Sequence, residues 1–326
     1  MGMDIKQILS PLATELEQVD RIIASNLETG VPVIDRSAMH LFYSGSGGKK
    51  IRASLVLLSS GLRGPAPEGV IDLAAAVEIL HAASLVHDDI IDKSYMRRGN
   101  ISVPGKYGNK VAVLAGDYMY STAVNIAIRD SDSRIFEAMA DATKEMVKGE
   151  LYQIEYSSLN SITEERYYAI IERKTARLMA ASCRIGGLKA GYSEEECRAL
   201  HEAGLNMGYA FQIVDDTFDF AESSDVTGKD VGNDFKDGKI TLPFIYILEK
   251  GTAAQKEALG RFAADPDSAD WGGVKDLVHS SGAFEYSVGA AVKFAGVARD
   301  KLNIFAESSY LDIIRGIIDF IVERNY

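Results

Sequence analysis

Residues 78–92 read EILHAASLVHDDIID and carry the clearest structural signal in the chain. Apolar residues recur there at intervals of three and four, the spacing of one face of an α-helix. At 100° per residue, Asp88 and Asp92 lie about 40° apart around that helix, and we expect Asp89 to share their face. The stretch therefore predicts an apolar helix that ends in three neighbouring carboxylates.

Three carboxylates on one face repel one another and resist burial unless a cation balances their charge. Mg²⁺ prefers oxygen ligands, and proteins usually bind it through a few carboxylates together with substrate phosphates. A solvated helix end explains one such cluster equally well. A single cluster therefore leaves both interpretations open.

The same spacing recurs 127 residues after Asp88, where residues 208–219 read GYAFQIVDDTFD. Asp215, Asp216 and Asp219 end a second apolar stretch with helical spacing. Two matching clusters predict two facing helices whose carboxylates hold several Mg²⁺ ions around a diphosphate. The repeat makes solvated helix ends a much poorer explanation of either cluster.

Basic residues accompany both clusters along the chain. Residues 47–52 read GGKKIR, a glycine turn before a helix that suits an anion. Arg97 and Arg98 follow the first cluster, Lys174 lies in a later helical segment, and residues 228–239 form a polar loop with glycines. Each alone is more often a solvated charge, but together they predict two anion sites, one rich in metal and one built from Arg, Lys and His.

Helical periodicity extends through most of the chain. It covers, among others, residues 70–92, 134–156, 164–189 and 193–222. Strand-like alternation is scarce, and no low-complexity segment or linker divides the sequence. We expect an all-α protein of roughly a dozen helices that folds as a single domain over residues 1–326.

Composition excludes several classes of function. The 326 residues are 47% hydrophobic and 25% charged, which are ordinary globular proportions. A formal charge of −12 argues against a nucleic-acid binder and against broad adhesion to anionic lipid. Cys183 and Cys197 are too few for a disulfide framework or a zinc site. We expect no membrane-spanning stretch, no secretory signal and a cytoplasmic location.

These residues resemble the trans-isoprenyl diphosphate synthases, also called polyprenyl synthetases, in several ordered motifs between about residues 47 and 248. The matching motifs are Gly47-Gly-Lys49-x-x-Arg52, Asp88-Asp-x-x-Asp92, Arg97-Arg98-Gly99, Ala115-Gly-Asp117, Gly149-Glu150, Lys174-Thr175, Phe211-Gln212-x-x-Asp215-Asp-x-x-Asp219 and Gly238-Lys239-x-Thr241-Leu-Pro243. The resemblance implies an isoprenoid synthase-type bundle of long helices around a central cavity, usually as a homodimer. One departure is Ala53, where the family usually has proline.

The resemblance also implies a role for each site residue. About three Mg²⁺ ions would hold the allylic diphosphate, and their ligands would be Asp88, Asp89, Asp92, Asp215, Asp216 and Asp219. The side chains expected at that diphosphate are Arg97, Lys174, Thr175, Gln212, Lys229 and Lys239. Those expected at isopentenyl diphosphate are Lys49, Arg52, His81 and Arg98. The implied catalytic set is Asp88, Asp89, Asp92, Lys174, Thr175, Gln212 and Asp215.

Product length is expected to depend on the helix of residues 70–92, as one wall of the growing product's cavity. Family members with short products tend to place an aromatic residue four or five positions before the first aspartate, where this chain has Ser84 and Ala83. Ala76, Leu80 and Ala83 form one stripe, and a helical turn rises about 5.4 Å, close to one isoprene unit. We expect a product of roughly C30 to C50, suited to a quinone side chain. The floor of the cavity would be Leu80 or one of Met119, Tyr120, Phe136 and Met139.

Several alternatives stay open at this point. Within the family, the chain could be a short-chain farnesyl or geranylgeranyl diphosphate synthase, or the catalytic subunit of a heteromeric synthase. Outside it, His40, His81 and His87 beside Asp88 could form a metal-dependent phosphohydrolase, which would leave the second aspartate cluster unexplained. A terpene cyclase of similar fold would not need basic motifs for a second diphosphate.

Overall fold

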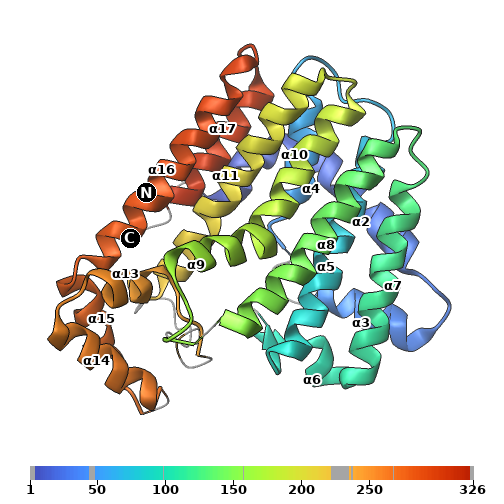
Figure 1. Ribbon diagram of the computed structural model, residues 1–326. Coiled ribbons are helices and arrows are strands. Elements are labelled where there is room, and N and C mark those ends of the chain that lie inside the picture. Colours follow the sequence, from blue (N-terminus) through green and yellow to red (C-terminus); the bar gives the residue numbers. More distant parts are fainter. Residues whose placement is uncertain are drawn as a thin grey trace.

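The computed structural model describes residues 4–43, 48–97, 99–156, 158–221, 235, 238–266 and 268–323, and within them the chain is a bundle of helices (Figure 1). The longer helices before the second aspartate cluster are α2 (Ala13–Leu27), α3 (Pro32–Tyr43), α4 (Ile51–Ser60), α5 (Val70–Ile91), α7 (Asn109–Ala127), α8 (Ser133–Tyr156), α9 (Glu164–Ile171) and α10 (Arg177–Lys189). Helix α11 (Glu194–Phe218) carries that cluster, and α13 (Leu242–Lys250), α14 (Ala253–Ala264), α15 (Trp271–Ser280), α16 (Ala283–Lys301) and α17 (Ser309–Val322) follow it.

Short elements complete the described chain. They are α1 (Ile5–Ile8), α6 (Val103–Tyr107), the 3₁₀ turns η1 (Ser10–Leu12) and η4 (Leu302–Ile304), and the π-helical turn η2 (Glu172–Ala176). Strands β1 (Met96–Arg97) and β2 (Asn100–Ile101) pair antiparallel, with Met96 opposite Ile101. This two-stranded ribbon follows the first aspartate cluster and is the only sheet among the described residues. The predicted all-α class is therefore confirmed.

Helix α5 is the central element of the largest hydrophobic core, where it packs against α2, α4, α7 and α10. Its length and composition would allow it to cross a membrane, contrary to the expectation that no stretch would reach that length. However, 67% of its most apolar window is buried inside the protein. An apolar sequence on all sides is what a helix surrounded by other helices requires. Burial in the core therefore accounts for its composition.

The segment predicted as one helix over residues 164–189 contains an interruption. Helix α9 passes through the π-helical turn η2 into α10, and the Arg177 N–H donates to the Glu172 carbonyl five residues earlier. A π turn inserts one extra residue into an otherwise regular helix and is frequent at functional sites. Hydrophobic spacing did not reveal it, because the buried residues across the turn, Ile171, Thr175 and Leu178, still follow one another at intervals of four and three.

Glycines allow two close contacts around this helix. A Cβ on Gly186 of α10 would lie 2.4 Å from the Val56 carbonyl oxygen of α4, and one on Gly208 of α11 would lie 2.3 Å from the Ala176 Cα. Because no side chain fits at either distance, these backbones approach more closely than ordinary helices do. The second contact fixes α11 directly against the π turn.

A smaller apolar cluster lies beyond the end of α11, where α13, α14 and α15 pack together (Figure 1). Phe220 stacks on Trp271 and meets the edge of the Phe244 ring. These contacts join the segment just after the second aspartate cluster to the C-terminal helices. A single domain over residues 1–326 stays a prediction.

Candidate active site

The end of α5 carries an excess of negative charge. Asp88 is half-buried, and burial raises its pKa to about 7, with the Glu150 and Asp92 carboxylates adding to the rise and Lys174 and Arg97 opposing it. A raised carboxyl pKa means that the charged form is disfavoured where it stands. The position is therefore one where a bound cation would stabilise the structure.

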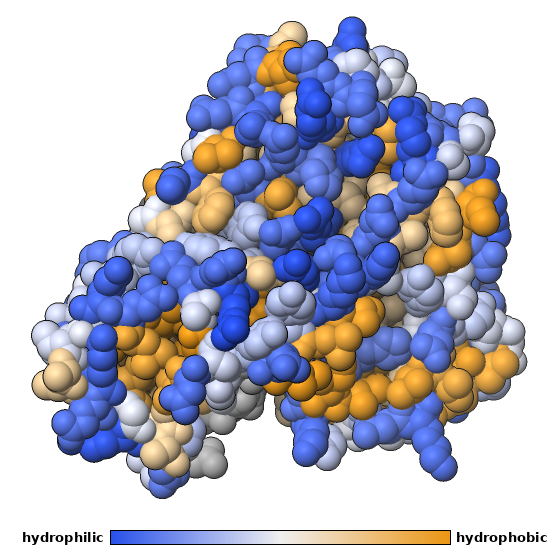
Figure 2. Space-filling model, viewed as in Figure 1, coloured by the Kyte–Doolittle hydropathy of each residue, from blue (hydrophilic) through white to orange (hydrophobic). Residues whose placement is uncertain are grey.

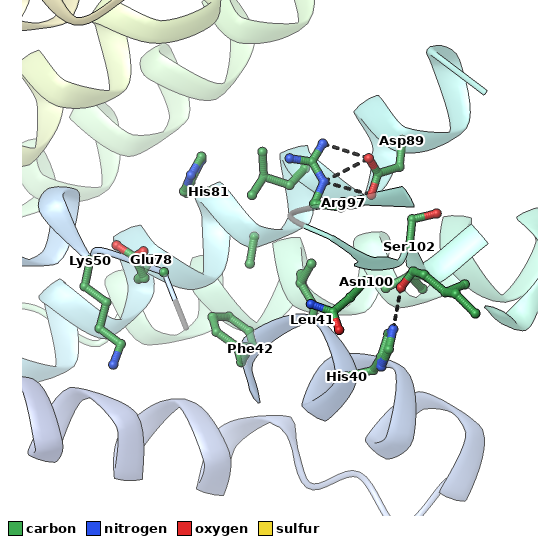
Figure 3. A pocket seen from close by; sticks show the side chains of 15 residues that line it. His40, Leu41, Phe42, Lys50, Glu78, His81, Asp89, Arg97, Asn100 and Ser102 are labelled. Carbon is green, nitrogen blue, oxygen red and sulfur yellow. Dashed lines mark hydrogen bonds and ion pairs between the residues drawn. The ribbon is translucent and has the colours of Figure 1, made fainter. Parts of the chain in front are cut away.

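Asp89 differs from Asp88 in its burial and in its partner. Its side chain is 1% exposed and accepts two hydrogen bonds from Arg97 Nε, at 2.9 and 3.0 Å, while Arg97 Nη2 lies 2.7 Å from Oδ1 (Figure 3). The physical reason is that consecutive helical residues point about 100° apart. Arg97, expected at the allylic diphosphate, is thus engaged with Asp89, and the role of each with a ligand stays a prediction.

Lys174 extends from the π turn toward α8 and the first cluster. Its ammonium lies 2.6 Å from Glu150 Oε1 and donates to Gln153 Oε1 at 2.7 Å. Gly149 allows this approach, because a Cβ there would lie 2.9 Å from the Lys174 backbone nitrogen. The sequence motif Gly149-Glu150 had no assigned role, and Gln153 gave no sequence signal; both surround the predicted diphosphate lysine.

Thr175, the next residue, reaches the second cluster on the other side of the turn. Its hydroxyl donates to Gln212 Oε1 at 2.7 Å, and Gln212 Nε2 donates to Asp216 Oδ1 at 2.8 Å. The Tyr167 hydroxyl, from α9, donates to Asp216 Oδ2 at 2.7 Å. Tyr167 gave no sequence signal, because 49 residues separate it from its partner.

A lysine from later in the chain approaches the first cluster. Lys239, which follows the second cluster in sequence, lies with its ammonium 3.4 Å from Asp92 Oδ2 of the first. Asp215 is exposed at the last turn of α11, and Asp219 is its C-terminal cap. Lys174 thus lies near Asp88 of the first cluster, and Thr175 is linked through Gln212 to Asp216 of the second. That the two clusters form one site stays a prediction.

The donor set fits a hard divalent cation. Among the described residues, no three His, Cys, Asp or Glu side chains already converge as ligands of one ion. The aspartates and Glu150 nevertheless supply only oxygen donors, which Mg²⁺ takes. The raised pKa of Asp88 marks the uncompensated charge that such an ion would balance. Ligation by the six predicted aspartates stays a prediction.

The predicted residues for the second substrate lie around the start of α4. Arg52 Nη1 is 3.0 Å from His81 Nε2, and the Lys49 ammonium lies 4.9 Å from the centre of the Phe320 ring on α17. Lys50 adopts a left-handed conformation with φ of 46° and pairs with Asp20 at 2.6 Å. Two predicted diphosphate ligands, Arg98 and Lys229, lie outside the described residues.

A pocket opens between α3, the start of α4, α5 and the β ribbon (Figure 3). Its polar lining includes Lys50, Glu78, His81, Asp89 and Arg97. The buried Glu78 carboxylate accepts the N–H of Ala53 at 3.3 Å. A proline at that position, as in most of the family, could not donate this hydrogen bond. Alanine in place of the family's usual proline thus supplies a backbone N–H that donates to Glu78.

The predicted stripe for product length is buried beneath Asp88. Ala76, Leu80 and Ala83 are 0%, 2% and 3% exposed, and the same core cluster holds Met119, Met139 and the partly buried Phe136. Tyr120 is 38% exposed and therefore does not close this region within one chain. The half-buried Ser84 donates its hydroxyl to the His81 carbonyl at 2.8 Å. Their role in product length stays a prediction.

Comparison with known proteins agrees with this geometry. A model of the polyprenyl synthetase family matches residues 32–279. A short chain isoprenyl diphosphate synthase of Methanothermobacter thermautotrophicus is 34% identical over 99% of each chain. An octaprenyl diphosphate synthase of Haemophilus influenzae is 32% identical over 99% of this chain and 98% of its own.

A solved structure extends the likeness to the whole fold. It is a polyprenyl synthase from Caulobacter crescentus complexed with calcium and isoprenyl diphosphate. It has a TM-score of 0.91 to this chain at 28% identity, covering 100% of this chain and 99% of the other. The chain therefore belongs to the polyprenyl synthetase family of prenyltransferases.

Proposed function

We propose that this chain is a Mg²⁺-dependent trans-polyprenyl diphosphate synthase acting in the cytoplasm. It would add isopentenyl diphosphate head-to-tail to an allylic diphosphate and make a product of roughly C30 to C50 for quinone side chains. The observation that carries this function is the position of two adjacent residues in one turn. Lys174 is near enough to Asp88 to oppose the rise of its pKa, and Thr175 donates to Gln212, which donates to Asp216.

The side chains have distinct tasks in this reaction. About three bound Mg²⁺ ions would supply Lewis-acid stabilisation of the leaving diphosphate. Lys174 and Lys239 place ammonium groups beside the first cluster, where they offset the charge that develops on that diphosphate. Thr175 and Gln212, already hydrogen-bonded together, hold a hydroxyl and an amide oxygen toward the reacting allylic carbon.

The second substrate is held from the other side. Arg52 and His81, in contact at the start of α4, would bind the diphosphate of isopentenyl diphosphate together with Lys49. The alkene of that substrate attacks the allylic carbon as the carbon–oxygen bond to the first diphosphate breaks. The released diphosphate then takes the proton, so the reaction needs no dedicated side-chain base.

Product length is inferred from the wall of the cavity. The two relatives described above differ in the product class that their names state, so overall identity does not select one. The small side chains of Ala76 and Ala83 favour a product that passes several turns along α5. The alternative is a short-chain synthase, in which a buried residue such as Met119 stops the product early.

We also propose that the functional unit is a homodimer formed through α7 and α8. Val147, Leu151 and Ile154 of α8 are 57%, 60% and 64% exposed and share one face of the helix. Val113 and Leu114 of the adjacent α7 are also exposed, and Figure 2 shows apolar side chains gathered on this part of the surface. A contiguous apolar surface of this kind marks a protein interface. A heteromeric synthase would use the same face for an unlike subunit.

Substitutions at Asp88 and Asp89 should distinguish an effect on catalysis from an effect on stability. Asp88→Asn should lower kcat by about a hundredfold or more, because it removes a metal ligand, while leaving the metal-free melting temperature unchanged or higher. Asp89→Asn should lower that melting temperature, because it leaves Arg97 without its buried partner. Steady-state kinetics and thermal melts in EDTA measure both. An Asp88→Asn enzyme with wild-type turnover would show that this carboxylate holds no catalytic metal.

Substitutions in the α5 stripe test whether these residues determine product length. Ala83→Phe and Ala76→Phe both place a ring in the cavity, but at heights about 10 Å apart, or about two isoprene units. Both variants should shorten the product, and the Ala83 variant should stop about two units earlier. Chromatography of the dephosphorylated products measures this, with leucine variants as milder substitutes if phenylalanine impairs folding. Unchanged lengths in folded variants would place the product elsewhere.

The mass of the particle in solution tests whether this surface forms the dimer. Leu151→Glu should convert a particle of two chains into a monomer, because a charge at the centre of an apolar interface is costly to bury. Ile304→Glu is the matched control, since Ile304 is 45% exposed on η4, away from α7 and α8. Light scattering after size exclusion gives the masses. A wild-type protein that is monomeric at micromolar concentration would contradict the homodimer.

A further inference from the structure

Two residues outside the predicted site are paired in a way that a regular helix does not permit. Glu172 and Arg177 are five residues apart, which places them about 140° apart around an α-helix. Here the Arg177 N–H donates to the Glu172 carbonyl, and Arg177 Nε donates to Glu172 Oε1 at 2.9 Å. The backbone and the side chains of the same two residues therefore both close the π turn.

A third residue completes the contact from a neighbouring helix. The Tyr209 hydroxyl, on α11, donates to the other carboxylate oxygen of Glu172 at 2.6 Å. The Tyr209 ring is itself held by Phe294 of α16, stacked with ring centres 4.6 Å apart. The direction of the Glu172 carboxylate is therefore set by two helices, and both of its oxygens are engaged.

We propose that Glu172, Arg177 and Tyr209 form a brace that holds the π turn open and thereby positions Lys174 and Thr175 for catalysis. Their hydrogen bonds join them to one another, and among the described residues these bonds do not reach a side chain predicted to bind substrate or metal. They are positioning residues, and their role in turnover rests on the proposed prenyl transfer.

The brace is needed because the same backbone could instead form a regular α-helical turn. A turn with i→i+5 hydrogen bonds is rare, since the backbone normally closes with i→i+4 bonds. If the segment relaxed to that register, the side chains within it would rotate by up to about 100° relative to α9 or α10. The contact of Lys174 with Glu150 at 2.6 Å and that of Thr175 with Gln212 at 2.7 Å could not then both persist.

Kinetics of Arg177→Ala test the brace. We expect kcat to fall about tenfold or more, because small misplacements of reacting groups are costly in rate. The KM for isopentenyl diphosphate should stay within about twofold of wild type, because Arg52 and His81 lie outside the turn. Arg184→Ala is the matched control, since Arg184 lies two turns further along α10 and pairs with the exposed Glu194 at 3.3 Å.

An exchange of charges distinguishes positioning from a general loss of stability. The double variant Glu172→Arg/Arg177→Glu restores an opposite-charge pair across the turn and should recover most of the lost kcat. Amide hydrogen exchange over residues 172–177 should be faster in Arg177→Ala and should return toward wild type in the exchanged pair. This second readout needs no substrate.

The outcomes are distinguishable. Wild-type kcat and wild-type exchange in Arg177→Ala would overturn the brace. The brace would also be overturned if kcat and the melting temperature both fell in Arg177→Ala and kcat did not recover in the exchanged pair. That result would mean that these residues only stabilise the fold. If wild-type enzyme elongates no prenyl diphosphate, the proposed function fails, while the exchange data still test whether the brace holds the turn.

Discussion

One widened turn of helix, η2 (Glu172–Ala176), determines how the site is assembled. It places two adjacent side chains so that Lys174 reaches α8 and the first aspartate cluster, while Thr175 reaches Gln212 and the second. Gly149 on one side and Gly208 on the other let neighbouring helices approach its backbone. The two clusters end separate helices, α5 and α11, and residues of this one turn contact neighbours of both.

Charge explains why this site needs both its basic residues and its ions. Burial and the neighbouring acids raise the pKa of Asp88 to about 7, so the carboxylates are held close at a cost to stability. Lys174 and Arg97 offset part of that charge, and under the proposed function a metal-bound diphosphate would offset the rest. Under the proposed function, binding of that complex would therefore relieve the unfavourable charge of the empty site.

Local patterns in the sequence were enough for the fold class and for the two clusters, because helical periodicity and the Asp-Asp-x-x-Asp spacing depend on neighbouring residues alone. Three features required coordinates. Asp89 pairs with Arg97 of strand β1. The sequence of the aspartate cluster alone does not show that this strand folds back to the end of α5. The π turn leaves the apolar spacing intact, and Tyr167 meets Asp216 across 49 residues.

The proposed function requires both aspartate clusters to bind one diphosphate through shared metal ions. The most direct measurement is a crystal structure with Mn²⁺ and a non-hydrolysable allylic diphosphate analogue, with the metals located by anomalous scattering. We predict manganese peaks at Asp88, Asp92 and Asp215 around a single diphosphate that also contacts Lys174. Manganese confined to one cluster, or a diphosphate bound away from the π turn, would contradict it.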